Sequence, residues 1–142
     1  MANNKVIEIN KMQLMNLVNN LLRQVQKCCN QTQSPKLSDF EKWMAPNFQL
    51  FSNGKIISKN AADYMKRLVN FQKKFVHMEI SDMLEEPLIY ENKMAVHYDI
   101  DLTGRNGNQS KVFVMAIITL ENDKVLRWEQ VAHEKGTGIW DS

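Results

Sequence analysis

The sequence has few cysteines, no long hydrophobic run and almost no excess of charge of either sign. No apolar run is long enough to cross a bilayer, and the first ten residues lack the basic-then-apolar order of a secretion signal. We therefore expect a cytoplasmic protein that does not insert into a membrane. Its 18 basic and 16 acidic residues are interspersed, for a formal net charge of +2, which argues against an extended surface for nucleic acid.

Motifs for metals, phosphates and activated nucleophiles are also missing. The three histidines, His77, His97 and His133, are scattered and match no spacing of a known ligand set. There is no glycine-rich phosphate loop and no nucleophile elbow. Cys28 and Cys29 are adjacent on a predicted helix, where neighbouring side chains diverge, so a reduced, packed pair is expected in preference to a disulfide or a metal site. Any chemistry is predicted to need no cofactor.

The composition that remains is that of one globular domain. Hydrophobic residues make up 44% of the chain and charged residues 24%. A length of 142 residues suffices to bury a core without metals or cross-links, and it is short for two domains. We expect a single domain over residues 1–142.

Helical periodicity dominates the first third of the chain. Apolar residues recur three and four positions apart from Met12 to Cys29, which predicts an amphipathic helix. Ser38 and Glu41 have the spacing of a capping box, which predicts a short helix that carries Trp43 and ends before Pro46.

A further helix is predicted after Ser58 or Asn60, either of which can cap it. One side of this helix is apolar, and the other is basic and interpreted as its solvent side. The apolar side comprises Ala61, Tyr64, Met65, Leu68, Phe71 and Phe75, and the basic side Lys66, Arg67, Lys73 and Lys74.

The second half of the chain alternates with the period of strands. The dipeptide Asn53-Gly54 favours a tight hairpin between two short strands. Four longer strands follow, joined by short links rich in turn formers, which makes them antiparallel neighbours. Their predicted ranges are Val76 to Leu84, Lys93 to Thr103, Ser110 to Leu120 and Val125 to Glu134. The fold class is therefore α+β, with a curved antiparallel sheet wrapped around N-terminal helices as a cone-shaped barrel.

Two strands have informative faces. In Lys93 to Thr103, the residues Val96, Tyr98, Ile100 and Leu102 share one face, and His97, Asp99 and Asp101 share the other. In Ser110 to Leu120 both faces are apolar, because Phe113, Met115 and Ile117 oppose a second apolar set. Since the helices can cover one face only, the other predicts a partner, and we favour a homodimer over additional cover from the same chain.

The order of these elements resembles the nuclear transport factor 2-like superfamily, nearest to its SnoaL-like and ketosteroid-isomerase-like branch. The resemblance covers nearly the whole chain and includes the segment Ala45 to Phe48 and the hairpin Ser52 to Lys55. Local similarity extends to Met94 to Tyr98 and Asp123 to Glu129. It implies a pocket between the sheet and the helices, and often a dimer through the outer sheet face.

The resemblance also implies positions for catalytic groups. A carboxylate base of ketosteroid-isomerase-like members falls at a position that looks like Ser52 or Asn53, and their acidic hydrogen-bond donor at Met115 or Ala116. None of these four residues can take those roles. The aspartate near the end of the last strand in SnoaL-like cyclases looks like His133 here, which keeps a proton-transfer group.

The candidate catalytic residues are His133 and Tyr98. Histidine titrates near neutrality, so His133 would suit acid–base work in a pocket, but it is also typical of a solvated strand end. If Leu126, Trp128, Gln130 and Ala132 face inward, His133 faces outward unless a bulge shifts the strand. Tyr98 could bind a ligand oxygen or simply pack in the core. His97 and Asp99 resemble an acid–base pair but share the polar face.

The candidate ligand-binding residues are Trp128, Gln130, Tyr64 and Trp43. A flat apolar wall with one amide is typical of small-molecule pockets, and an ordinary structural role is equally open. Two functions are thus predicted. The first is binding of a small hydrophobic ligand, with a cofactor-independent isomerase, cyclase or dehydratase as the enzymatic form. The second is a non-catalytic module for dimerisation or protein binding.

Overall fold

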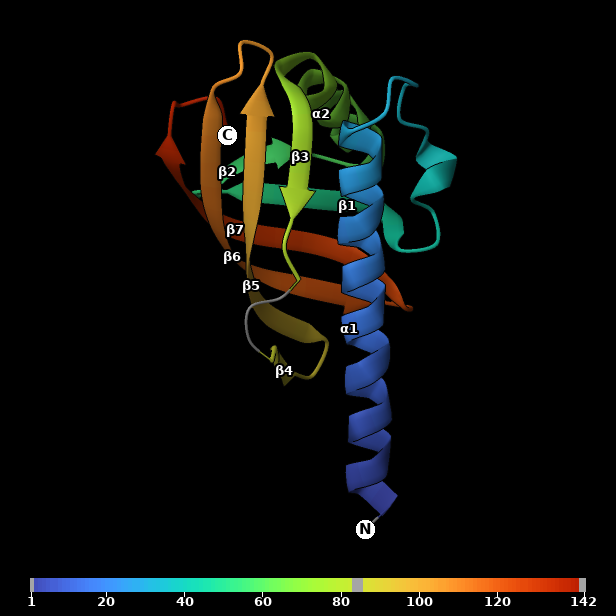
Figure 1. Ribbon diagram of the computed structural model, residues 1–142. Coiled ribbons are helices and arrows are strands. Elements are labelled where there is room, and N and C mark those ends of the chain that lie inside the picture. Colours follow the sequence, from blue (N-terminus) through green and yellow to red (C-terminus); the bar gives the residue numbers. More distant parts are fainter. Residues whose placement is uncertain (1, 83–85, 141–142) are drawn as a thin grey trace.

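The computed structural model describes the backbone of residues 2–82 and 86–140, and side chains from Lys11 onward. Two long helices cover the inner face of one strongly curved, unclosed sheet of seven strands (Figure 1). The elements are α1 (Ala2–Cys29), η1 (Leu37–Asp39), β1 (Met44–Ser52), β2 (Lys55–Ser58), α2 (Ala61–Lys74), β3 (Phe75–Ile80), β4 (Leu88–Tyr90), β5 (Lys93–Gly104), β6 (Gln109–Glu121) and β7 (Lys124–Gly136).

The sheet has the strand order β2-β1-β7-β6-β5-β3, with β4 paired to β5. The predicted antiparallel neighbours β5, β6 and β7 are confirmed, as is the hairpin of β1 and β2 around Asn53-Gly54. One pair departs from the prediction, because β1 runs parallel to β7 and the sheet is therefore mixed. This pairing joins the first strand to the last, and no short-range pattern in the sequence records it.

The alternation expected for the long strands is present in the structure. In β5 the side chains of Val96, Tyr98 and Ile100 are buried beneath the helices, while the intervening residues face outward. In β6 Val112, Val114, Ala116, Ile118 and Leu120 are buried in the same way. The sheet therefore contributes one continuous apolar layer to the core.

The short helix predicted around Trp43 is wrong. A single 3-10 turn, η1, takes its place, and the chain is already in β1 at Met44. Pro46 lies within β1, where the ladder to β7 is interrupted between Met44 and Gln49. Proline has no N–H to give to a ladder, so it is tolerated where pairing is interrupted.

The predicted strand over Val76 to Leu84 is shorter in the structure. β3 ends at Ile80, and Met83 and Leu84 lie outside the described residues. The three-residue strand β4 was not predicted at all, because it pairs with β5 only through Leu88, Ile89 and Tyr90.

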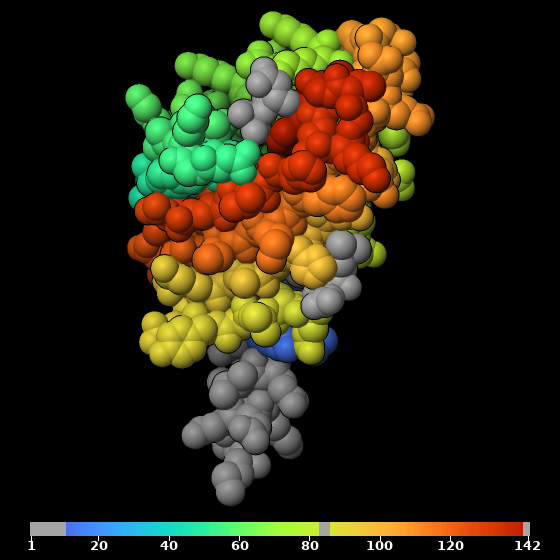
Figure 2. All heavy atoms as spheres, turned by 90° about the vertical axis from the view of Figure 1, so that its left-hand side faces the viewer, coloured from blue at the N-terminus to red at the C-terminus, as the bar shows by residue number. Residues whose placement is uncertain are grey.

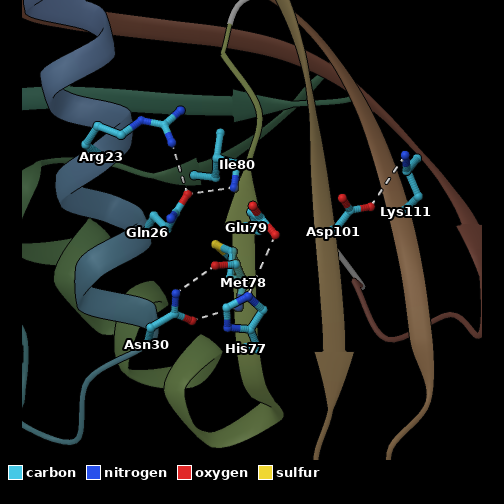
Figure 3. Close-up of polar contacts among 9 residues, drawn as sticks. All are labelled: Arg23, Gln26, Asn30, His77, Met78, Glu79, Ile80, Asp101 and Lys111. Carbon is cyan, nitrogen blue, oxygen red and sulfur yellow. Dashed lines mark hydrogen bonds and ion pairs between the residues drawn. The ribbon is translucent and has the colours of Figure 1, made fainter.

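Side-chain amides at the C-terminal end of α1 and directly after it bind the outer edge of β3 (Figure 3). Asn30 Nδ2 donates to the carbonyl of Met78, and the Met78 N–H donates to Asn30 Oδ1, both at 2.7 Å. Gln26 Oε1 accepts the N–H of Ile80, also at 2.7 Å. Because β3 is at the end of the sheet, these amides satisfy backbone groups that a further strand would otherwise pair with.

Both ends of α2 are stabilised by side chains. Asn60, one of the two predicted candidates, caps the first turn, since its Oδ1 accepts the N–H of Asp63 at 2.7 Å. At the other end the guanidinium of Arg105, from the β5–β6 turn, donates to the carbonyls of Gln72 and Lys73. A cation at a helix C-terminus also interacts favourably with the helix dipole. These contacts fix the position of α2 over the sheet.

In the part of the chain that the structure describes, no helix is sufficiently long and apolar to span a membrane.

Candidate functional site

An apolar cavity lies between the two helices and the inner face of the sheet. It holds about 540 Å³ of atom-free space, open mouth included, and about 50 Å³ of this is wide enough for the centre of a water molecule. Small-molecule sites in proteins are typically mostly apolar with a few polar groups. The cavity is lined by Leu21, Leu22, Val25, Met44, Phe48, Leu50, Tyr64, Arg67, Phe71, Met78, Ile80, Tyr98, Ile100, Trp128, Gln130 and Trp140.

The helix α2 contributes Tyr64, Arg67 and Phe71, which are three and four residues apart and so share one side of the helix. The Tyr64 ring packs edge-on against Phe48, with ring centres 5.4 Å apart. The guanidinium carbon of Arg67 lies 4.6 Å from the centre of the Phe71 ring and 5.5 Å from that of Trp140. Arg67 was predicted on the solvent side of the helix. That prediction is wrong, because Arg67 is half-buried at the cavity wall.

The sheet contributes Tyr98 from β5 and Trp128 and Gln130 from β7. The rings of Tyr98 and Trp128 meet edge-on at 6.3 Å between centres. Gln130 Nε2 donates to Ser52 Oγ at 3.2 Å, which orients the amide from the neighbouring strand. The cavity thus places two phenols, one amide and one guanidinium in apolar surroundings.

A bulge at Leu126 sets the inward register of β7. Thr119 pairs with Arg127 and Leu120 with Val125, so Leu126 is the extra residue. The bulge lets both Val125 and Trp128 face inward although they are three residues apart. Leu126, predicted to face inward, is only half-buried for this reason.

The two phenols are hydrogen-bond donors under ordinary conditions. Burial raises the pKa of Tyr98 and of Tyr64 well above the usual range, and the nearby Arg67 cation opposes the shift only in part. Both hydroxyls therefore stay protonated at neutral pH. They can donate a hydrogen bond to a ligand oxygen but cannot act as bases.

Four of the six predicted site residues come together at the cavity, namely Tyr98, Trp128, Gln130 and Tyr64. His133 does not, because it follows the inward Gln130 by an odd number of residues and pairs with Phe113 on the outer face, where it is exposed. Trp43 also lies elsewhere. It precedes the inward Met44 and lines a separate surface hollow with Lys27 and Asp39.

The other positions considered for acid–base chemistry are structural or outward-facing. His97 and Asp99 lie on the outer sheet face, as predicted. Ser52 is buried beside Gln130, whereas the Asn53 side chain exchanges hydrogen bonds with the backbone of Ala132 and ties the β1–β2 hairpin to β7.

Sequence reasoning missed Arg67 and Trp140. For Arg67 the signal was available, because it is three residues from Tyr64 and four from Phe71 on the same helix. Trp140 lies beyond the last strand, in a segment without periodicity, so its contact with Phe71 at 5.3 Å between ring centres could not be anticipated. These two residues form one end of the cavity together with Phe71.

The outer face of the sheet carries a second feature, an apolar patch formed by Phe113, Met115, Ile117 and Val131. Figure 2 shows the surface of β6 and β7, on which these residues lie, in orange and red. Met115 and Val131 are directly opposite each other on β6 and β7, and their exposures are 68% and 65%. The described part of the chain places no element over this patch. Cover from the same chain, the alternative considered above, is therefore not found among these described residues.

The described residues contain no group of three or more histidine, cysteine or carboxylate side chains able to hold a metal ion. Cys28 and Cys29 are free and buried, as expected for a packed pair. Burial raises the pKa of the Cys29 thiol to about 12, so this thiol is not a reactive nucleophile at neutral pH.

Comparison with known proteins gives no match to any protein-family model and none to a curated protein. Solved structures do match. A SnoaL-like polyketide cyclase from Agrobacterium tumefaciens is 13% identical, with 84% of this chain and 91% of that chain covered at a TM-score of 0.65. An LEH-like epoxide hydrolase of Mycobacterium tuberculosis is 9% identical, with 86% and 84% covered at 0.67. An NTF2-like protein of unknown function from Burkholderia pseudomallei is 13% identical, with 78% and 88% covered at 0.56.

These similarities establish the fold. The chain has the nuclear transport factor 2-like, SnoaL-like architecture that the order of its elements predicted. At identities this low the comparison shows the fold alone, so function must be argued from the cavity and the outer face.

Proposed function

We propose that this protein is a small-molecule-binding domain whose ligand occupies the cavity between α2 and the inner sheet face. The observation that carries the proposal is the convergence of Tyr98, Gln130 and Arg67 on one apolar cavity. Sparse polar groups in apolar walls orient a ligand, while the walls supply the hydrophobic contribution to its affinity. The narrow interior favours a compact ligand, and a bulky one would have to displace side chains.

The lining residues favour binding over proton-transfer catalysis. An isomerase, cyclase or dehydratase that works by proton transfer needs a group that is deprotonated near neutral pH. Among the described residues of the lining, Tyr64, Tyr98 and Arg67 are the ones with a titratable proton, and burial keeps the phenols protonated. Their hydroxyls are suited to holding a carbonyl or similar oxygen.

Native mass spectrometry of the purified protein, followed by a thermal-shift screen of compact apolar compounds, tests the proposal. We expect a bound small molecule or screening hits whose affinity falls about three- to tenfold in Tyr98→Phe, since one hydrogen bond is lost. Tyr90→Phe is the matched control, because Tyr90 is 77% exposed and lies outside the cavity. A protein that retains no ligand and gives no hits would refute the proposal.

A second candidate function is dimerisation through the outer sheet face. The specific observation is that four large apolar side chains, Phe113, Met115, Ile117 and Val131, are exposed together on two neighbouring strands. Ion pairs lie on either side of it, Lys111–Asp101 at 3.6 Å and Arg127–Glu129 at 3.0 Å. An apolar centre with charges of both signs at its rim suits a second copy of the same surface.

Met115→Asp tests this second function. A charge at the centre of a buried apolar interface should convert a dimer to a monomer in analytical ultracentrifugation. Met12→Asp is the control, because Met12 on α1 has a similar exposure of 65% and is far from the patch in the sequence and in the fold. A wild-type protein that sediments as a monomer at all concentrations would exclude dimerisation through the outer sheet face.

A further inference from the structure

One end of the cavity has a chemistry of its own. Arg67 brings a permanent positive charge to the wall, and its guanidinium carbon lies beside the rings of Phe71 and Trp140, 4.6 Å and 5.5 Å from their centres. These rings are themselves in contact, with centres 5.3 Å apart. The positive charge therefore lies at the end of the cavity that these two rings line.

Trp140 adds an independent indication of a ligand. Its side chain is buried, with 6% exposure, and its indole Nε1 has no hydrogen-bond partner in the part of the chain that the structure describes. A buried donor without a partner is destabilising and is uncommon in folded proteins. An acceptor oxygen on a ligand at this end of the cavity would satisfy it.

Resting on the proposed small-molecule function, we propose that the ligand is a compact apolar carboxylic acid whose carboxylate is bound by Arg67 and the indole N–H of Trp140. The planar, forked guanidinium matches the two oxygens of a carboxylate. The apolar part of the acid would then lie against Leu22, Phe48 and Ile100, which line the rest of the cavity. A neutral ligand of the same shape would leave the indole N–H with a poorer acceptor and would gain little from the cation.

The test uses two matched pairs of probes, benzoate with benzamide and hexanoate with hexanamide. Both acids are ionised at pH 7, so each pair differs in charge at nearly constant shape. Isothermal titration calorimetry should show each acid binding at least about tenfold more tightly than its amide, as charge-assisted hydrogen bonds are about twice as strong as neutral ones. Arg67→Gln should abolish that preference, because it should weaken acid binding far more than amide binding. Lys66→Gln is the control, because Lys66 is the neighbouring residue and is exposed, and this variant should keep the preference for acids over amides.

Trp140→Phe provides a second variant that keeps the aromatic ring and removes the N–H. It should weaken acid binding by about three- to tenfold and weaken amide binding less, because an amide oxygen is the poorer acceptor for the lost N–H. It also keeps the proposal falsifiable should Arg67→Gln fail to fold by circular dichroism. Inorganic phosphate, an anion without an apolar part, should bind more weakly than benzoate.

The outcomes separate this inference from the proposed function. If acids and amides bind equally well to the wild-type protein, or if acid binding is unchanged in Trp140→Phe and Arg67→Gln, recognition of a carboxylate is refuted and the cavity remains a neutral binding site. Phosphate that binds as tightly as benzoate would refute the role of the apolar walls. If no probe of either class binds to folded wild-type protein, both the inference and the binding of compact ligands are refuted.

Discussion

Replacing Asn30 by alanine should destabilise the protein by uncovering the edge of β3. The Asn30 side chain makes two hydrogen bonds of 2.7 Å with the backbone of Met78, one as donor and one as acceptor. At a net contribution of about 0.5–1.5 kcal/mol for each, the pair stabilises the fold by about 1–3 kcal/mol. Because Asn30 itself is exposed and water can reach the vacated position, we expect a loss of about 1–2 kcal/mol in the free energy of unfolding.

Urea denaturation measures the total effect, and hydrogen exchange locates it. The amide of Met78 should lose protection in Asn30→Ala, while amides at the centre of β6, such as that of Val114, should keep theirs. Asn30→Asp should be destabilising as well, because it keeps the acceptor for the Met78 N–H but sets a carboxylate against the Met78 carbonyl. Asn20→Ala is the control, since Asn20 is an exposed asparagine on α1 and its effect should stay within about 0.5 kcal/mol. Unchanged exchange at Met78 in Asn30→Ala would show that these hydrogen bonds do not protect the edge.

Three further outcomes are expected. Gly136→Ala should destabilise the protein by about 2–4 kcal/mol, because the added Cβ would lie 2.5 Å from Ser110 Oγ at a φ of +147°. Gly138→Ala is the control and should lose only about 1–2 kcal/mol, because Gly138 has a φ of +77° but open space around it. Equal shifts of the melting temperature in the two variants would contradict the steric reasoning. Stability should fall as pH rises from 9 towards 12, because the folded-state pKa of Cys29, about 12, lies above its ordinary value of 9.0 and the unfolded chain releases that proton first. In urea titrations across this range, the free energy of unfolding of Cys29→Ala should decline less steeply than that of the wild type. An identical slope in the two proteins would contradict the role of the Cys29 thiol. Asn60→Ala should lose about 1 kcal/mol through its missing cap on α2, and a change below experimental error would mean that water replaces the cap fully.

Much of the sheet could be predicted from the sequence because its signals are local. The positive φ values at Asn53 and Gly54, 51° and 83°, are those the dipeptide was expected to adopt. The alternation of buried and exposed residues in β5 follows from strand geometry alone, so the inward position of Tyr98 could be predicted correctly.

The errors arose where tertiary contacts override a local pattern. Ser38 and Glu41 have capping-box spacing, yet the chain makes only the turn η1 there because Met44 is needed in the pairing of β1 with β7. This pairing brings together residues about 80 positions apart in the chain. The bulge at Leu126 likewise appears only when the lengths of β6 and β7 are compared in the folded sheet.

The candidate site was predicted in part. Tyr98, Trp128 and Gln130 followed from alternation, and the spacing of Arg67 from Tyr64 and Phe71 was also informative, but its charge was interpreted as a sign of the solvent side. Its position depends on Trp140, which packs from the end of the chain against Phe71. A pocket wall assembled from separate segments is visible only once those segments have been brought together.

The amide contacts between α1 and β3 also determine how far the helix can slide along the sheet. Moving α1 by one residue would shift it about 1.5 Å along its axis and would break the hydrogen bonds of Gln26 and Asn30 together. The same helix carries Leu21, Leu22 and Val25 into the cavity wall. Gln26 and Asn30 therefore hold α1 at the position along the sheet that sets the depth of the cavity. Substitutions of these two residues should change the length of the ligand that the cavity accepts.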